Sequence, residues 1–92
     1  MIQVEMPREG EKILKIVSRS GMSSILSSLE KNPMRFSQLM FKTRLNPGIL
    51  DRHLKSLIKF GIVEKDEEKY ILTQRGERLI EVLRDLLSLY EV

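Results

Sequence analysis

Basic side chains gather in the middle third of this sequence. Residues 31–60 carry seven lysines and arginines against one acid, a local charge of +6, whereas residues 1–30 sum to zero and residues 61–92 to −3. Ammonium and guanidinium groups bind phosphate oxygens, and a guanidinium can also bond bidentately to guanine. A basic surface is usually just solvated, so this distribution favours double-stranded DNA as a partner only together with the predicted helix-turn-helix and hairpin. The seven basic residues are Lys31, Arg35, Lys42, Arg44, Arg52, Lys55 and Lys59.

Other chemistry finds little support in the residue types. The sequence has no cysteine and a single histidine, His53, which excludes disulfides, thiolate catalysis and metal sites built on several soft ligands. We interpret His53 as a packing residue at the edge of the core. No nucleophile lies beside a base, and no glycine-rich loop or carboxylate pair is placed for catalysis. We therefore expect no enzyme activity, no metal and no cofactor.

The basic segment has the pattern of two helices joined by a tight turn. A short helix is expected from Ser37 to Thr43. Asn46-Pro47 predicts the start of a second helix, because asparagine is a good N-cap acceptor and proline at the first helical position loses no available hydrogen bond. This helix is expected to run from Pro47 to Phe60, with Gly61 as the left-handed residue after it. Two helices this close in sequence are typical of a helix-turn-helix.

The residues before this pair predict two further helices. Residues 8–18 support a short helix, and Ser20-Gly21 ends it. From Met22 the apolar residues recur at the i, i+3, i+4, i+7 spacing of a helix with one buried stripe, and Asn32-Pro33 ends that helix. Met1 to Met6 alternates apolar and polar residues, which suits a short edge strand or an extended arm.

After Gly61 the apolar period changes from that of a helix to that of a strand. Residues 62–65 and 69–72 are expected to pair as a hairpin whose loop is Asp66-Glu67-Glu68. Thr73 is a good N-cap for a last helix, whose apolar arc of about 180° exceeds the ~100° that packing on one small domain needs. The surplus predicts the same helix of a second subunit as partner. The expected dimerisation residues are Leu79, Ile80, Val82, Leu83, Leu86, Leu87, Leu89 and Tyr90.

These elements predict one domain over residues 1–92, mainly α with a small β component (α+β). We expect a winged helix-turn-helix with a three-helix core, a two-stranded wing and an amphipathic C-terminal helix. Residues 1–21 would form an N-terminal arm and helix, residues 22–73 the winged helix, and residues 74–92 the dimerisation helix. No apolar run is long enough to cross a bilayer and no signal-peptide pattern opens the chain. We expect a cytoplasmic, nucleoid-associated protein without membrane association.

From Met22 onward the chain resembles the winged helix-turn-helix transcriptional regulators of the MarR (multiple antibiotic resistance), ArsR (arsenical resistance) and HxlR types. The resemblance implies a winged-helix fold and DNA binding in the control of transcription. It identifies no small-molecule effector. The matching passages are Arg35-Phe36-Ser37, Leu39, Leu45-Asn46-Pro47, Leu50, Arg52-His53-Leu54-Lys55, Leu57, Gly61-Ile62-Val63 and Ile71-Leu72-Thr73-Gln74-Arg75-Gly76.

Three positions depart from the pattern of these regulators. The glycine of the tight turn is replaced near Thr43-Arg44, so a non-glycine residue is expected in a strained conformation at a cost of ~1 kcal/mol. A serine on the groove-facing side of the second helix is replaced by Asp51, which can accept from a cytosine amino group but repels phosphate. The acidic loop of the hairpin is not expected to enter a minor groove, where the potential is negative.

We place the DNA contacts on the outward side of the second helix and on the residues before it. Arg52 is the candidate for base readout, and Ser37 and Gln38 are expected to donate to a phosphate at the start of the short helix. The remaining cations are expected to position the protein on the backbone. The buried side of the second helix is expected to comprise Leu50, Leu54, Leu57 and Ile58. The expected DNA-binding residues are Arg35, Ser37, Gln38, Lys42, Arg44, Asn46, Pro47, Gly48, Asp51, Arg52, Lys55 and Lys59.

Two other functions fit the sequence. A winged helix can serve as a protein-interaction adaptor, and Asp51 together with the acidic hairpin loop favours that alternative. The protein could also bind nucleoid DNA without sequence preference. Asp51 itself has a structural interpretation, since it is placed to pair with Lys55 one helical turn away.

Overall fold

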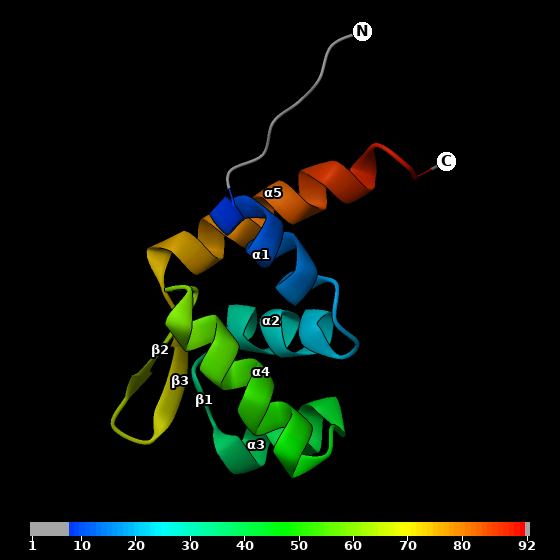
Figure 1. Cartoon of the computed structure of the whole chain (residues 1–92). Coiled ribbons are helices and arrows are strands. Elements are labelled where there is room, and N and C mark those ends of the chain that lie inside the picture. The colour runs from blue at the N-terminus through cyan, green and yellow to red at the C-terminus, as the bar shows by residue number, and fades with distance from the viewer. Residues whose placement is uncertain (1–7, 92) are drawn as a thin grey trace, which may run out of the picture.

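The computed structural model describes residues 8–91 as five helices with one small antiparallel sheet at the side of the helical body (Figure 1). This arrangement confirms the mainly helical α+β fold. The strand or arm expected over residues 1–6 lies outside the described residues. The elements in chain order are α1 (Arg8–Val17), α2 (Met22–Lys31), β1 (Met34–Arg35), α3 (Phe36–Thr43), α4 (Pro47–Lys59), β2 (Val63–Asp66), β3 (Lys69–Leu72) and α5 (Gln74–Ser88).

The expected two-stranded hairpin is confirmed as β2 and β3, and a third strand that was not predicted extends the sheet to the order β1-β3-β2. Hairpin strands β2 and β3 pair from Val63 opposite Leu72 to Asp66 opposite Lys69. The additional strand, β1, pairs Met34 with Tyr70 on the other edge of β3. Two residues are too few to show an alternating pattern, so sequence periodicity could not reveal β1.

The helix boundaries follow from local chemistry. Asn46 caps α4 by accepting from the N–H of Gly48 at 2.8 Å and, more weakly, from the N–H of Ile49 at 3.4 Å. Gly61 follows α4 with φ 71°, the left-handed conformation expected of it. The Thr73 hydroxyl accepts from the N–H of Gly76 and starts α5.

Gly76 fits where a side chain could not. A Cβ at this position would lie 2.2 Å from the backbone oxygen of Ile62. The same oxygen accepts from the N–H of Thr73 at 3.0 Å. The passage from the hairpin into α5 is therefore pressed tightly against the residues that follow α4.

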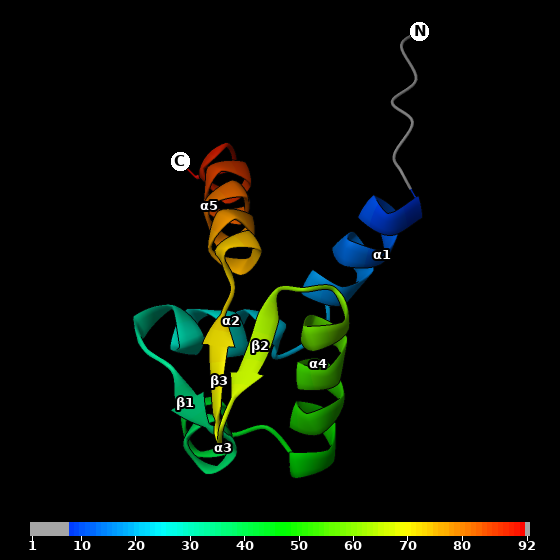
Figure 2. The same ribbon diagram turned by 90° about the vertical axis from the view of Figure 1, so that its left-hand side faces the viewer.

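Helix α2 lies at the centre of the fold. Figures 1 and 2 show α3 and α4 below it, the hairpin beside it, and α1 and α5 above it. Its four apolar stripe residues are all buried, as their spacing predicts. The surrounding core comprises Ile16, Met22, Ile25, Leu26, Leu29, Met34, Leu39, Leu50, Leu54, Leu57, Ile62, Val63, Tyr70, Leu72 and Ile80.

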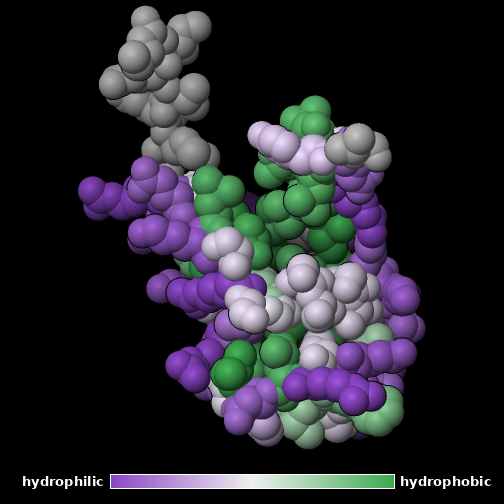
Figure 3. Space-filling model, turned by 90° about the vertical axis from the view of Figure 1, so that its right-hand side faces the viewer, coloured by the Kyte–Doolittle hydropathy of each residue, from purple (hydrophilic) through white to green (hydrophobic). Residues whose placement is uncertain are grey.

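Helix α5 packs on its own domain with its N-terminal half and leaves the other half uncovered. Ile80 is buried in the core of the same chain, which corrects its assignment as a dimerisation residue, and Leu79 and Leu83 are half-buried against that core. Figure 3 shows the apolar face that remains between α1 and α5. No helix of residues 8–91 combines the length and apolarity needed to cross a membrane. The large exposed apolar residues of these two helices and the residues after α5 are Leu14, Val82, Leu86, Leu87, Leu89 and Tyr90.

Candidate nucleic-acid interface

The residues that begin α4 are exposed. Pro47 occupies the first helical position, and Pro47, Gly48 and the capping residue Asn46 are all exposed. The Asn46 side-chain oxygen is occupied by the cap, so its amide N–H groups are the part still available to a ligand. The helix therefore presents small side chains and the Asn46 amide at the end that enters a groove most easily.

The outer side of α4 carries its cations. Arg52, Lys55 and Lys59 are exposed, whereas Leu50, Leu54 and Leu57 on the opposite side are fully buried. This orientation is the predicted one. Ile58, which was expected on the buried side, is 40% exposed because it lies at the edge of the apolar stripe.

Asp51 and Lys55 form an ion pair one helical turn apart on this surface. The Lys55 Nζ lies 2.8 Å from Asp51 Oδ2, and both side chains are substantially exposed. The hydrogen bond to Asp51, assisted by the attraction of its charge, raises the pKa of Lys55 above its ordinary value. The predicted pairing of Asp51 with Lys55 is confirmed. The pair holds the Lys55 ammonium beside a carboxylate, which would repel a DNA phosphate.

Arg44 forms the tight turn between α3 and α4 in a left-handed conformation, with φ 59° and ψ 25°. Its N–H donates to the oxygen of Met40 at 2.9 Å, which ends α3. The Thr43 hydroxyl donates to the oxygen of Leu39 at 2.7 Å and also accepts from the N–H of Leu45. The strained non-glycine residue predicted for this turn is therefore Arg44, and its side chain is exposed.

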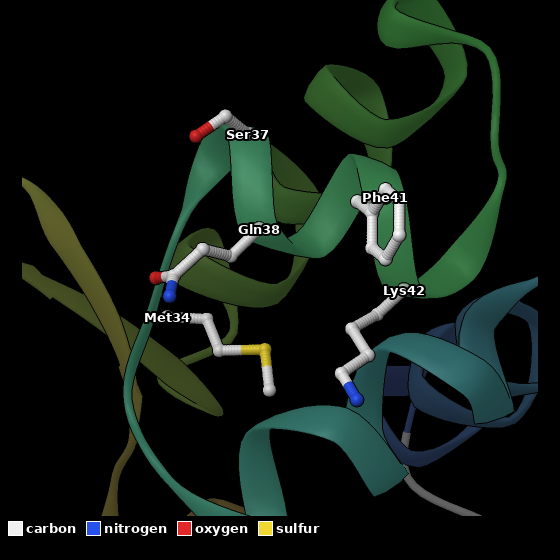
Figure 4. Close-up of a pocket in the computed structure, with 5 residues that line it drawn as sticks. All are labelled: Met34, Ser37, Gln38, Phe41 and Lys42. Atoms are coloured by element: carbon white, nitrogen blue, oxygen red, sulfur yellow. The ribbon is translucent and has the colours of Figure 1, made fainter.

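Helix α3 presents a second group of the predicted contact residues. The Gln38 Oε1 accepts from the N–H of Arg35 at 2.8 Å, which caps α3 and leaves the Gln38 amide N–H groups free to donate. Ser37, Gln38 and Lys42 line a shallow hollow of about 300 Å³ with Met34 and Phe41. Figure 4 shows Met34 and Lys42 extending toward the same space.

Phe41 is the most unusual member of this hollow, because its ring is 80% exposed. Phe36 and Met40 on the other side of α3 are half-buried against the core. Of the neighbours Met40 and Phe41, Met40 is therefore the one that points inward. An exposed ring beside Lys42 gives this end of the interface an apolar spot.

His53 connects α4 to the start of α2. It is 8% exposed, and its Nε2 lies 2.9 Å from the backbone oxygen of Ser20. No group of three or more histidine, cysteine, aspartate or glutamate side chains within residues 8–91 is placed to hold a metal ion. His53 is thus held within the packing between two helices, as its interpretation as a packing residue requires.

The hairpin presents acids at its tip. Asp66, Glu67 and Glu68 are exposed, and Glu67 adopts φ 57° in the two-residue turn. The basic side chains of the interface therefore lie on α3, the turn and α4, while the tip of the wing is negative.

Sequence reasoning did not find Arg19. This residue follows α1 and lines one hollow with Arg52 and another with Lys59. The sum of charges over residues 1–30 hid it, because the four acids in that range cancel the four cations. Helical spacing could have shown that Arg19 continues a line of cations along α1, but not that this line lies beside α4.

Comparison with known proteins defines the class. Residues 19–65 match the model of the bacterial regulatory protein, arsR family, and the chain belongs to that family. An uncharacterized HTH-type transcriptional regulator of Methanocaldococcus jannaschii, MJ0361, is 35% identical over an alignment of 88 residues that covers 86% of this chain and 81% of the relative.

Solved structures confirm the winged helix-turn-helix fold. Diamide-treated YodB from Bacillus subtilis superposes with a TM-score of 0.82 at 23% identity, covering 90% of each chain. NolR from Sinorhizobium fredii has a TM-score of 0.69 at 23% identity over 97% of each chain. The homodimeric winged helix-turn-helix DNA-binding domain of Mb0332 from Mycobacterium bovis has a TM-score of 0.68 at 15% identity, covering 94% of this chain and 91% of that one.

Proposed function

We propose that this chain is a homodimeric transcriptional regulator that binds double-stranded DNA sequence-specifically, with α4 in the major groove. The observation that carries the proposal is the surface of α4, whose exposed first turn and outward cations oppose a fully buried apolar side. Membership of a regulatory family supports it. The winged-helix domain of Mb0332, described as homodimeric and DNA-binding, supports it by analogy.

Within this proposal Arg52 reads a base edge. Its guanidinium can bond bidentately to guanine, which is worth about 1 to 3 kcal/mol of discrimination. Gly48 and Pro47 allow the backbone to approach the groove, and Asp51 faces a cytosine amino group or a position without a close phosphate. The residues that contact phosphates are Arg35, Ser37, Gln38, Lys42, Arg44, Asn46, Lys55 and Lys59.

The dimer forms through the uncovered half of α5. Val82, Leu86 and Leu87 present apolar surface that the chain itself does not bury, and Leu79 and Leu83 border it. Leu89 and Tyr90 extend the surface beyond the helix. Two α4 helices would then address half-sites about one helical turn of DNA apart. Such a regulator acts on chromosomal DNA, which places it in the cytoplasm with the nucleoid, and it has no catalytic step.

Fluorescence anisotropy tests the proposal against its alternatives. The protein is titrated against duplexes enriched from its genome and against scrambled duplexes, at several salt concentrations. A regulator shows steep salt dependence together with sequence preference, and a nucleoid protein shows the first without the second. No binding at about 50 to 100 mM salt would favour an interaction adaptor, for which the exposed Phe41 would be the first contact to examine.

A further inference from the structure

A stripe of basic side chains follows one side of α1. Arg8, Lys12, Lys15 and Arg19 recur at the i, i+4, i+7, i+11 spacing that places residues on one side of a helix, with Arg19 just beyond the last turn. All four are exposed. The acids of the same helix, Glu9 and Glu11, fall to either side of this stripe by the same spacing.

The stripe borders a groove between α1 and α4. One hollow of about 270 Å³ is lined by Lys12, Lys15, Ile16 and Arg19 on one side and by Ser56, Lys59 and Phe60 on the other. A second hollow of about 540 Å³ is lined by Arg19, Ser20, Leu45, Ile49, Arg52 and His53. Arg19 belongs to both, so the two hollows adjoin. We call them together the α1–α4 groove. Figures 1 and 2 both show α1 and α4 on the same side of the molecule.

The groove concentrates positive charge. Five cations line it, and among the described residues none that lines either hollow is acidic. Glu9 approaches one of the five, with its Oε1 3.7 Å from Lys12 Nζ, in an exposed pair. Both hollows also have apolar lining, such as Ile16 and Ile49. Such a surface suits a polyanion whose charges alternate with less polar groups, as phosphates alternate with sugars along the DNA backbone. The five cations are Lys12, Lys15, Arg19, Arg52 and Lys59.

We propose that the α1–α4 groove binds the phosphate backbone of the same DNA duplex whose major groove receives α4. The inference rests on the proposed function, and it assigns α1 to the DNA-binding surface. Arg52 and Lys59 connect the two regions because they lie on the outward side of α4 and also line the groove. The acidic tip of the hairpin repels DNA phosphates on its side of α4. Further contacts with the DNA backbone are therefore assigned to α1, on the other side of α4.

The test compares Lys15→Ala/Arg19→Ala with Lys31→Ala/Arg78→Ala, a control that removes the same charge. Lys31 ends α2, and Arg78 is an exposed residue of α5 that pairs with Glu81; neither lines the α1–α4 groove. Anisotropy titrations of the 92-residue chain with a preferred duplex give the slope of log affinity against log salt. Each lost phosphate contact should reduce that slope by about 0.9, so the double variant should lose about 1.8 and the control nothing.

Sequence preference separates this role from base readout. The ratio of affinities for preferred and scrambled DNA should stay unchanged in the double variant, because backbone contacts do not specify sequence. A second variant, Lys15→Arg/Arg19→Lys, keeps both charges and should keep the wild-type slope. This variant guards against an effect of substitution on folding.

The outcomes distinguish the two proposals. If the wild type binds DNA and Lys15→Ala/Arg19→Ala has the same salt slope, the inference about the groove is wrong. The proposed function is unaffected by that result. An equal loss in the Lys31→Ala/Arg78→Ala control also overturns the inference, since net charge would then explain the effect. Wild-type protein that binds no DNA overturns the proposed function, and the inference with it.

Discussion

Arg44 holds a left-handed conformation that a residue with a Cβ adopts at a cost of about 1 to 2 kcal/mol. Replacing it by glycine removes that cost but adds freedom to the unfolded chain. We expect Arg44→Gly to raise the free energy of unfolding by about 0.5 to 1 kcal/mol, measured by urea denaturation. It should also weaken DNA binding, because a proposed phosphate contact is lost.

The control at this position is Arg44→Ala, which removes the charge but keeps the Cβ. It should weaken DNA binding as much as the glycine variant and bring no stabilisation. A glycine variant less stable than the alanine variant would show that the turn is not strained as its φ of 59° indicates.

Asp51 offers a second prediction at the scale of one side chain. Asp51→Asn keeps the size of the residue, removes its repulsion of phosphate and releases Lys55 from an ion pair of 2.8 Å. We expect tighter binding to scrambled DNA and a salt slope steeper by about 0.9, the value of one added phosphate contact. Asp85→Asn, on the polar side of α5, makes the same change of charge and should leave both quantities unaltered. Unchanged binding by Asp51→Asn would place Asp51 away from the DNA backbone.

Among the contacts between secondary-structure elements, one ion pair joins α5 to α2. Both terminal nitrogens of Arg84 donate to the carboxylate of Glu30, across 54 positions of sequence. These hydrogen bonds and the attraction of the Arg84 charge hold the pKa of Glu30 below its ordinary value. The pair sits beside an apolar hollow between the two helices that Leu83 and Leu87 line. It therefore contributes to the angle at which α5 leaves the domain.

The lowered pKa gives this pair a pH dependence of definite sign. A carboxyl with a depressed folded-state pKa contributes stability that is fully present above its unfolded pKa, ordinarily about 4.3. The contribution is lost as pH falls through the folded value. We expect Glu30→Gln to melt below the wild type at pH 7, and the difference in Tm to close at acidic pH. Glu81→Gln, which breaks only the Arg78 pair within α5, should change the Tm less at pH 7. A difference between Glu30→Gln and the wild type that grows on acidification would contradict this account.

Most elements could be predicted from sequence because each has its own local signal. The signals were Asn46-Pro47 at the start of α4, Gly61 after its end and Thr73 as the cap of α5. Each of these signals depends on hydrogen bonds or backbone conformation within a few residues. Strand β1 could not be predicted, since it exists only because Met34 pairs with Tyr70 far along the chain.

The same distinction applies to the candidate site. Helical spacing placed Arg52, Lys55 and Lys59 outward correctly, because one helix decides it. The burial of Ile80 and the proximity of Arg19 to Arg52 depend on how helices pack against one another, which no local pattern records. The assignment of individual residues to DNA contacts remains a prediction.

The whole molecule is proposed to function as a dimer through the uncovered half of α5. Leu86→Glu places a charge on the exposed apolar face, where Leu86 is 46% exposed and not part of the core. Light scattering should give the wild type about twice the chain mass of 10.8 kDa, and the variant the mass of one chain. Ser88→Glu adds the same charge on the polar side of α5 and should stay dimeric. A wild-type monomer at micromolar concentration would contradict the dimer.

The central claim is that α4 reads DNA sequence through Arg52. The most direct measurement is the ratio of affinities for preferred and scrambled duplexes at one salt concentration, for wild type, Arg52→Ala and Lys55→Ala. The account predicts that Arg52→Ala lowers this ratio by about tenfold or more, matching the loss of 1 to 3 kcal/mol, while Lys55→Ala weakens both affinities alike. A ratio unchanged by Arg52→Ala would contradict it.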